Sequence, residues 1–129
     1  MSLTGHYTHS SDENLDAMLK AAGMSDCMCS KMSSSKPSME IKETGTGATI
    51  KYTCGSNTYT NNITYGEDSS VDVGGMKYTV NASKTPYGYE GTMTMGDKTG
   101  TTSVEIDGDT LTKTMTLEGV TAKRIFTKQ

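Results

Sequence analysis

Residues 39–57, with the sequence MEIKETGTGATIKYTCGSN, decide the fold class because apolar and polar side chains alternate along them with a period of two. Met39 and Ile41 enclose a charged residue, and Ile50 and Tyr52 enclose another. Segments containing glycine follow each of the two runs and can turn the chain. Alternation of this kind, interrupted by turn residues, is typical of antiparallel strands that bury one face.

The same alternation continues to the C-terminus, and polar turn segments containing Gly, Asp or Pro separate the runs. Together with Gly5–His9, these runs predict ten short strands at a regular spacing, which indicates an antiparallel barrel or sandwich. After the first hairpin, strands are predicted at Thr58–Tyr65, Ser69–Val73, Met76–Ser83, Tyr87–Met95, Lys98–Ile106, Thr110–Leu117 and Val120–Lys128.

Two short helices are predicted between the first strand and the second. Residues 10–13, SSDE, offer N-cap side chains and first-turn carboxylates for the first helix, and Gly23 can end it. A second helix can begin at Ser25 and must end before Pro37. The apolar stripe of the first helix consists of Leu15, Met18, Leu19 and Ala22.

The composition narrows the class of function. The net charge of -3 argues against a nucleic-acid or anionic-membrane partner, because both select a surplus of Lys and Arg. No apolar run approaches the length of a membrane span or of a targeting signal, which predicts a cytoplasmic protein without stable membrane insertion. Three cysteines, Cys27, Cys29 and Cys54, fit reduced thiols better than a disulfide framework.

Hydrophobic residues make up only 33% of the chain, which includes ten Met and no Trp. A solid core would be short of apolar material, whereas a shell around a cavity needs less of it. Methionine suits a cavity wall because its side chain is flexible and polarizable. A marginally stable polar domain would have the same composition, so both interpretations stay open.

The last hairpin predicts two cations inside the barrel. If Glu118 and Gly119 form a two-residue turn, cross-strand pairing gives one mainly apolar face that should point inward. The pairs on this face are Leu117 with Val120, Met115 with Ala122, Lys113 with Arg124, and Leu111 with Phe126. Two opposed buried cations are unfavourable unless something compensates them, and a bound carboxylate or sulfonate would do so. A slipped turn, a bulge at Gly119, or a Lys113 side chain that snorkels to the barrel end would alter this arrangement.

Several motifs resemble those of the intracellular fatty-acid-binding proteins, and they look most like the liver-type and bile-acid-binding branch. They are GHY at 5–7, ENLD at 13–16, MLK at 18–20, KPSMEI at 36–41, DGD at 107–109, TMTL at 114–117 and KRI at 123–125. The resemblance implies one domain over residues 1–129, folded as an all-β, ten-stranded, flattened antiparallel barrel with a two-helix lid. His9 stands where the family usually has an aliphatic residue, and Leu15 where it usually has an aromatic one.

The resemblance also implies a function, which is the intracellular transport of a hydrophobic ligand with an acidic head group, by a monomer without cofactor or metal. The expected ligand is a long-chain fatty acid or a bile-acid-like amphiphile. In the family an inward Arg, two residues before a Tyr, anchors the ligand carboxylate. Arg124 has this place, but Phe126 replaces the Tyr. The position of a frequent second Arg corresponds to Val104, so the usual clamp of two Arg is incomplete.

Alternation and the family's architecture together predict the cavity and its entrance. The predicted ligand-binding residues are Arg124, Lys113, Phe126, Met115, Tyr52, Ile50, Ile41, Ile63, Val71 and Met93. The predicted portal consists of Met18, Cys27, Met28 and Met32 under the lid, with the facing turns at Gly55, Ser56 and Gly74. Each wall residue could equally be ordinary core.

Two other classes of function remain open at this point. A barrel-based enzyme acting on a small apolar substrate would need a nucleophile and a base, and no spacing in the sequence brings such a pair together. A barrel that has lost its ligand could serve only to bind a partner. A zinc site would need Cys27 and Cys29 to converge with Cys54 and with His6 or His9, because two thiolates do not complete a tetrahedral site.

Overall fold

The protein is described from a computed structural model over residues 3–21, 23, 38–54, 57–73 and 76–129. Within these residues there are ten strands and one helix, α1 (Leu15–Ala21). The strands are β1 (Gly5–Glu13), β2 (Ser38–Glu43), β3 (Gly47–Cys54), β4 (Asn57–Thr64), β5 (Asp68–Val73), β6 (Met76–Thr85), β7 (Gly88–Met95), β8 (Lys98–Asp107), β9 (Thr110–Leu117) and β10 (Val120–Lys128). All strands from β2 onward fall where the sequence predicts them, apart from small differences at their ends.

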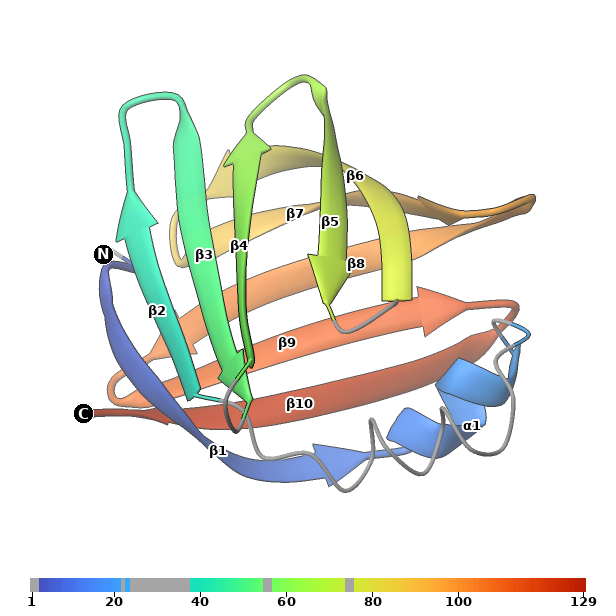
Figure 1. The fold of residues 1–129 in the computed structure, drawn as a ribbon, viewed down its shortest axis with the longest axis horizontal. Helices are drawn as coiled ribbons and strands as arrows, with labels where there is room; N and C mark the ends of the chain where they lie inside the picture. The colour runs from blue at the N-terminus through green and yellow to red at the C-terminus, as the bar shows by residue number, and fades with distance from the viewer. Residues whose placement is uncertain (1–2, 22, 24–37, 55–56, 74–75) are drawn as a thin grey trace.

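The ten strands form one antiparallel sheet in the order β4-β3-β2-β1-β10-β9-β8-β7-β6-β5. The sheet curls on itself, so that β2 to β5 cross in front of β7 to β10, and β1 curves along the edge that joins the two layers (Figure 1). This arrangement confirms the predicted all-β barrel.

The two ends of the sheet, β4 and β5, meet without a continuous ladder of backbone hydrogen bonds. The buried side chain of Asn61 bridges them: its amide donates to the Asp72 carbonyl at 3.1 Å, and its oxygen accepts from the Asp72 N–H at 2.9 Å. The Ser69 hydroxyl accepts from the backbone N–H of Thr64 at 2.9 Å. Side chains thus stand in for part of the missing ladder and close the barrel here.

The last hairpin has the predicted register. Glu118 and Gly119 have φ values of 52° and 79°, which are the two left-handed residues of a type I′ turn. Leu117 therefore pairs with Val120, and the register runs without a shift as far as Thr110 opposite Thr127. The predicted inward face is buried, which excludes a slipped turn or a bulge at Gly119.

The N-terminal region differs from the sequence-based prediction. Residues 10–13 were predicted as the cap and first turn of a helix, but β1 continues through them to Glu13. Asn14, with a φ of 54°, ends the strand, and α1 begins at Leu15. The hydrogen bonds that β1 makes with β10 outweigh the local preference of Ser and Asp for helix caps.

Helix α1 packs beside β9 and β10 through Leu15, Met18 and Leu19, as the apolar stripe predicts (Figure 1). The backbone N–H of Gly23 donates to the carbonyl of Lys20 at 2.9 Å, and the φ of Gly23 is 86°, which fits its predicted place after the helix. The predicted second helix lies within residues 24–37, outside the described residues. Within the described residues, no helix is long and apolar enough to span a membrane.

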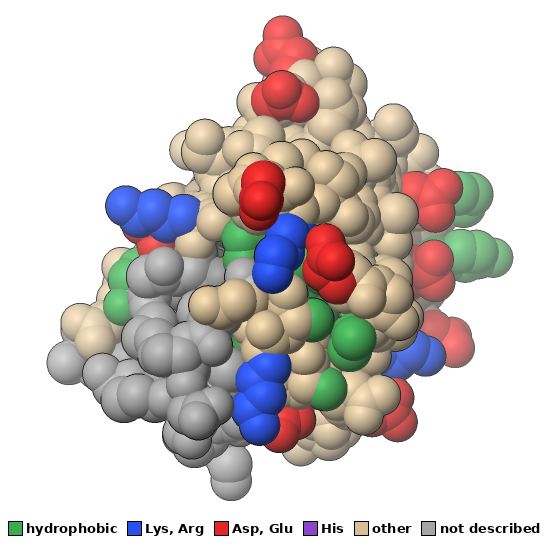
Figure 2. Space-filling model, turned by 90° about the vertical axis from the view of Figure 1, so that its right-hand side faces the viewer, with side chains coloured by type: hydrophobic (Ala, Val, Ile, Leu, Met, Phe, Trp, Pro, Cys, Tyr) green, Lys and Arg blue, Asp and Glu red, His purple; other side chains and the backbone are tan. Residues whose placement is uncertain are grey.

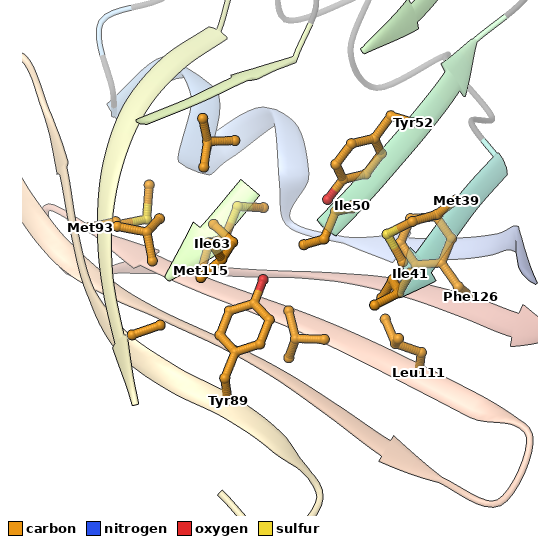
Figure 3. Close-up of a cluster of buried hydrophobic side chains, with 14 of the residues drawn as sticks. Met39, Ile41, Ile50, Tyr52, Ile63, Tyr89, Met93, Leu111, Met115 and Phe126 are labelled. Atoms are coloured by element: carbon orange, nitrogen blue, oxygen red, sulfur yellow. The ribbon is translucent and has the colours of Figure 1, made fainter. Parts of the chain in front are cut away.

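Apolar side chains from both layers fill the described interior (Figure 3). All the apolar residues predicted for the cavity wall are buried, with at most 6% of their surface exposed. The set comprises Ile41, Ile50, Tyr52, Ile63, Val71, Met93, Met115 and Phe126. On the outer face seen in Figure 2, acidic and basic side chains are interspersed over the described residues, and neither charge gathers into a broad patch.

One close contact between strands leads to a stability prediction. A Cβ on Gly91 in β7 would overlap the carbonyl oxygen of Asn81 in β6 and lie 2.7 Å from Cα of Ala82. Gly91→Ala should therefore push β6 and β7 apart and lower the free energy of unfolding by about 1–3 kcal/mol. The exposed neighbour change Thr92→Ala should cost no more than about 0.5 kcal/mol. Urea denaturation of both variants checks this, and equal costs would show that the strands are not this close.

Candidate functional site

Two buried cations lie side by side on the inner face of the barrel. Lys113 of β9 is directly opposite Arg124 of β10, and each residue is only 6% exposed. Both therefore point inward, as the hairpin predicts, and Lys113 does not snorkel to the barrel end. Like charges on opposite residues of a strand pair repel, so each cation needs its own compensation.

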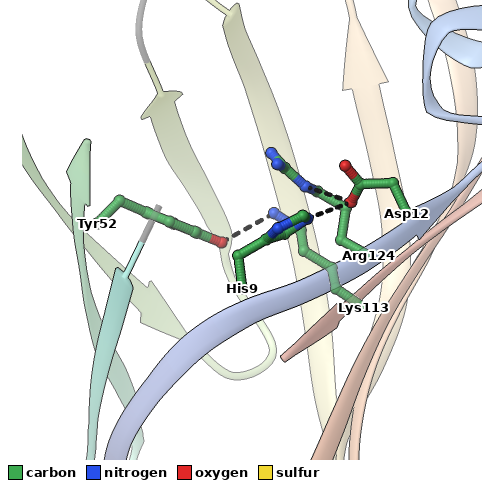
Figure 4. Close-up of polar contacts among 5 residues, drawn as sticks. All are labelled: His9, Asp12, Tyr52, Lys113 and Arg124. Carbon is green, nitrogen blue, oxygen red and sulfur yellow. Dashed lines mark hydrogen bonds and ion pairs between the residues drawn. The ribbon is translucent and has the colours of Figure 1, made fainter. Parts of the chain in front are cut away.

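Arg124 is compensated by a carboxylate of the protein itself (Figure 4). Its Nε donates to Oδ1 of Asp12 at 2.9 Å, and Nε2 of His9 lies 2.9 Å from the same oxygen. The His9 ring also meets the ring of Phe126 edge-on, with 5.7 Å between their centroids. The exposed side-chain fractions are 7% for Arg124 and His9 and 15% for Asp12, so this ion pair is nearly buried.

A break in the pairing of β1 with β10 places both Asp12 and His9 on the inner face of the barrel. His9 pairs with Phe126 and Asp12 with Arg124, and the register shifts between His9 and Ser11. Residues three apart in a regular strand point to opposite faces, but the extra residue of a β-bulge restores the same face. The bulge therefore allows the Asp12 carboxylate to meet Arg124 from the strand next to it.

Among the described residues, the groups that compensate Lys113 are uncharged. Its Nζ donates to the hydroxyl of Tyr52 in β3 at 2.9 Å and to that of Tyr78 in β6 at 3.1 Å. The same nitrogen lies 5.2 Å and 5.8 Å from the centroids of these two rings, within the range of a cation–π contact. No carboxylate of the described chain forms an ion pair with Lys113.

Two opposing effects act on the pKa of Lys113. Burial by itself lowers the pKa of the ammonium, whereas attraction to the ionised forms of Tyr52, Tyr78 and Tyr89, with the hydrogen bond to Tyr52, raises the pKa above its ordinary value. Burial also raises the pKa of Tyr78 and of Tyr89, so both phenols are neutral near pH 7. The cluster thus presents one positive charge and neutral hydroxyl groups.

A small internal cavity adjoins this cluster, with a volume of about 10 Å³. This is room for about one water molecule. The cavity is lined by Ile50, Tyr52, Asn61, Ile63, Val71, Tyr78, Val80, Tyr89, Thr102 and Lys113. The polar end lies at Lys113 and the remaining wall is mainly apolar, which is the arrangement that an amphiphile needs. A larger guest at this end must displace side chains.

Most of the predicted portal lies outside the described residues. Met18 is described, and it lies fully buried on the inward face of α1. The other predicted portal residues lie outside the described residues, or in turns that are not described: Cys27, Met28, Met32, Gly55, Ser56 and Gly74. No group of three or more metal-ligating side chains occurs in the part of the chain that the structure describes.

Sequence analysis missed the partners of both cations. Asp12 was assigned to a helix cap, and no periodicity revealed the bulge that turns it inward. Tyr78 lies at an alternating position of β6, but the spacing between strands so far apart in sequence does not show that it meets Lys113. His9 carried a visible signal, because it departs from the aliphatic residue that is usual in the resembling family.

The fold and the inward polar groups place this chain among the small antiparallel barrels that enclose charged side chains. The chain belongs to the lipocalin / cytosolic fatty-acid binding protein family, which it matches over residues 1–129. It is 31% identical to a liver fatty acid binding protein 1-A of Danio rerio, over 97% of this chain and 96% of that protein. It is 33% identical to the liver fatty acid-binding protein of Sus scrofa, over 97% of each chain.

Solved structures show the same fold. The fatty acid binding protein of Schistosoma mansoni, in complex with arachidonic acid, superposes with a TM-score of 0.87. The alignment covers 98% of this chain and 95% of that one, at 21% identity. The family resemblance predicted from the motifs is therefore confirmed, and its liver-type members are among the relatives found.

Proposed function

We propose that this protein binds and carries a long hydrophobic molecule with one acidic group, a long-chain fatty acid or a bile-acid-like amphiphile, inside its barrel. The observation that carries the proposal is Lys113, a buried cation whose hydrogen-bond partners, Tyr52 and Tyr78, are both uncharged. Burying such a charge is costly unless an anion accompanies it. The carboxylate of a ligand would supply that anion, while the apolar wall would take the hydrocarbon part.

The relatives support this proposal, because the two named above are liver fatty acid-binding proteins. We propose that Arg124, Phe126, Met115 and the apolar wall described above complete the ligand site. We also propose that its entrance is formed by Met18, Cys27, Met28, Met32, Gly55, Ser56 and Gly74. We further propose that the protein works as a cytoplasmic monomer, without cofactor or metal, and that it releases its ligand unchanged.

A catalytic function is less well supported. The His9 side chain contacts Asp12 and Phe126 in the described chain, and neither residue is a nucleophile of the Ser or Cys type. The third possibility, a barrel that only binds a protein partner, predicts an interior that never holds lipid. Native mass spectrometry of the purified protein, with solvent extraction of whatever it holds, distinguishes a carrier from such a module.

The first test is binding by the delipidated protein. Displacement of a fluorescent fatty-acid analogue by oleate should be saturable, with a Kd of about 1 μM or lower, which corresponds to about -8 kcal/mol. The apolar wall provides most of this free energy and Lys113 the preference for an acid. Failure of fatty acids and of bile salts alike to displace the analogue would rule out the proposed function.

A further inference from the structure

The two inward cations differ in what already surrounds them. Arg124 has the Asp12 carboxylate at 2.9 Å, whereas the partners of Lys113 among the described residues are phenol oxygens. Arg124 and Asp12 together carry no net charge, so the described interior holds one cation without a carboxylate partner. This distribution bears on which of the two cations a ligand would use.

We propose that Asp12 is a specificity-determining residue: it occupies Arg124 as an internal counter-ion and leaves the ligand's acidic group to Lys113, Tyr52 and Tyr78. This inference rests on the proposed function. It reverses the order that the family resemblance implies, in which the Arg of the last strand is the anchor. The ligand class that follows is a molecule with a single negative charge.

Repulsion between two carboxylates explains why Arg124 does not receive the acidic group of the ligand. An incoming carboxylate at Arg124 would lie beside the carboxylate of Asp12, and two anions in one buried site repel each other strongly. A ligand that took the place of Asp12 as the partner of Arg124 would also leave the Asp12 carboxylate nearly buried. Of the two contacts described above for that carboxylate, the one with His9 would remain. The cross-strand register and the bulge hold Asp12 in place, so it is not a mobile side chain that a ligand could easily displace.

Donor capacity explains why Lys113 is suited to the role. An ammonium has three N–H donors, and the hydroxyls of Tyr52 and Tyr78 accept two of them. Within the part of the chain that the structure describes, no side chain accepts from the third, which a carboxylate could take. Each phenol accepts from Lys113 and can still donate its own O–H, so a carboxylate at this point could receive one N–H and two O–H hydrogen bonds.

The test compares the affinity for oleate with that for oleyl alcohol in three proteins: wild type, Asp12→Asn, and the double variant Asp12→Asn/Arg124→Gln. Asp12→Asn keeps the shape of the side chain and releases the charge of Arg124, so oleate affinity should rise about tenfold, as for one additional charged hydrogen bond. The double variant should return to within about twofold of wild type, because neither protein has an available Arg124. The alcohol should bind all three equally.

Each departure from this pattern has a distinct meaning. Oleate affinity that falls about tenfold in the double variant, with alcohol binding kept, would show that Arg124 holds the acid in spite of Asp12 and would overturn the inference. Unchanged oleate affinity in Asp12→Asn would overturn it too. Wild-type protein that binds neither molecule would defeat the proposed function itself. If Asp12→Asn does not fold, the oleate affinities of wild type and of the double variant still show whether Arg124 holds the acid. The outward change Lys123→Met on the same strand is the control for charge alone.

Discussion

Lys113→Met should weaken the binding of a long-chain fatty acid by about 1.5–3 kcal/mol while leaving the matching alcohol almost unaffected. The change keeps an unbranched side chain of similar length and removes the charge and its donors. If the carboxylate is held by Lys113, only the acid uses what has been removed. The free energy of unfolding of the empty protein should at the same time stay constant or rise by about 1 kcal/mol, because a buried charge has gone.

Opposite effects on stability and on affinity are the signature of a binding residue. A structural residue would lower both quantities together. Isothermal titration with oleate and oleyl alcohol, beside urea denaturation without ligand, measures the two effects in one set of proteins. Lys123→Met is the matched control, since Lys123 lies on β10 with its side chain outside. An equal loss for acid and alcohol in Lys113→Met would mean that the variant has a damaged barrel rather than a missing charge.

Phe126→Ala should produce the largest loss of stability, about 3–5 kcal/mol. Phe126 is fully buried, it is the only Phe of the chain, and its ring meets His9 beside the Asp12–Arg124 pair. Truncation would remove apolar contacts and leave a cavity inside the barrel, beside the C-terminal half of β10. The His9 ring, which also contacts Asp12, would lose its aromatic neighbour.

Urea denaturation measures this loss, with two variants for comparison. Phe126→Leu retains most of the volume and should cost less than about 1.5 kcal/mol. Tyr87→Ala removes an aromatic ring that is 58% exposed and should cost no more than about 0.5 kcal/mol. Similar costs for Phe126→Ala and Tyr87→Ala would show that Phe126 is not part of a packed interior.

Most of the fold could be predicted from the sequence, because alternation of side chains and the choice of turn residues are local features. The side chains of β9 and β10 alternate strictly, and the two residues of their turn accept left-handed backbone, so strand, register and inward face could all be derived. The C-terminal part of β1 could not be derived in this way. Residues 10–13 favour a helix cap locally, and only the hydrogen bonds to β10, made across the whole length of the chain, show that they form a strand.

The site was predictable only in part, for a related reason. Alternation shows that Lys113 and Arg124 face inward, but it does not show what meets them. Tyr52 was predicted as a wall residue, and its hydrogen bond to Lys113 depends on the curvature of the barrel that brings β3 over β9. Asp12 depends on a bulge, which inserts a residue without any mark in the composition. A compensating carboxylate was expected from a ligand, whereas the protein supplies one for Arg124 itself.

The most direct test of the central claim, a buried ammonium that holds the ligand's acidic group, is the titration of bound oleate labelled with ¹³C at its carboxyl carbon. A neighbouring cation favours the charged form, so the pKa of the bound carboxyl should fall below that of a free side-chain carboxyl, about 4.3. The ¹³C signal should then keep its ionised position at about pH 4. A signal that titrates at or above the usual pKa would place the acid in solvent or in an apolar site without a cation, and would contradict the account.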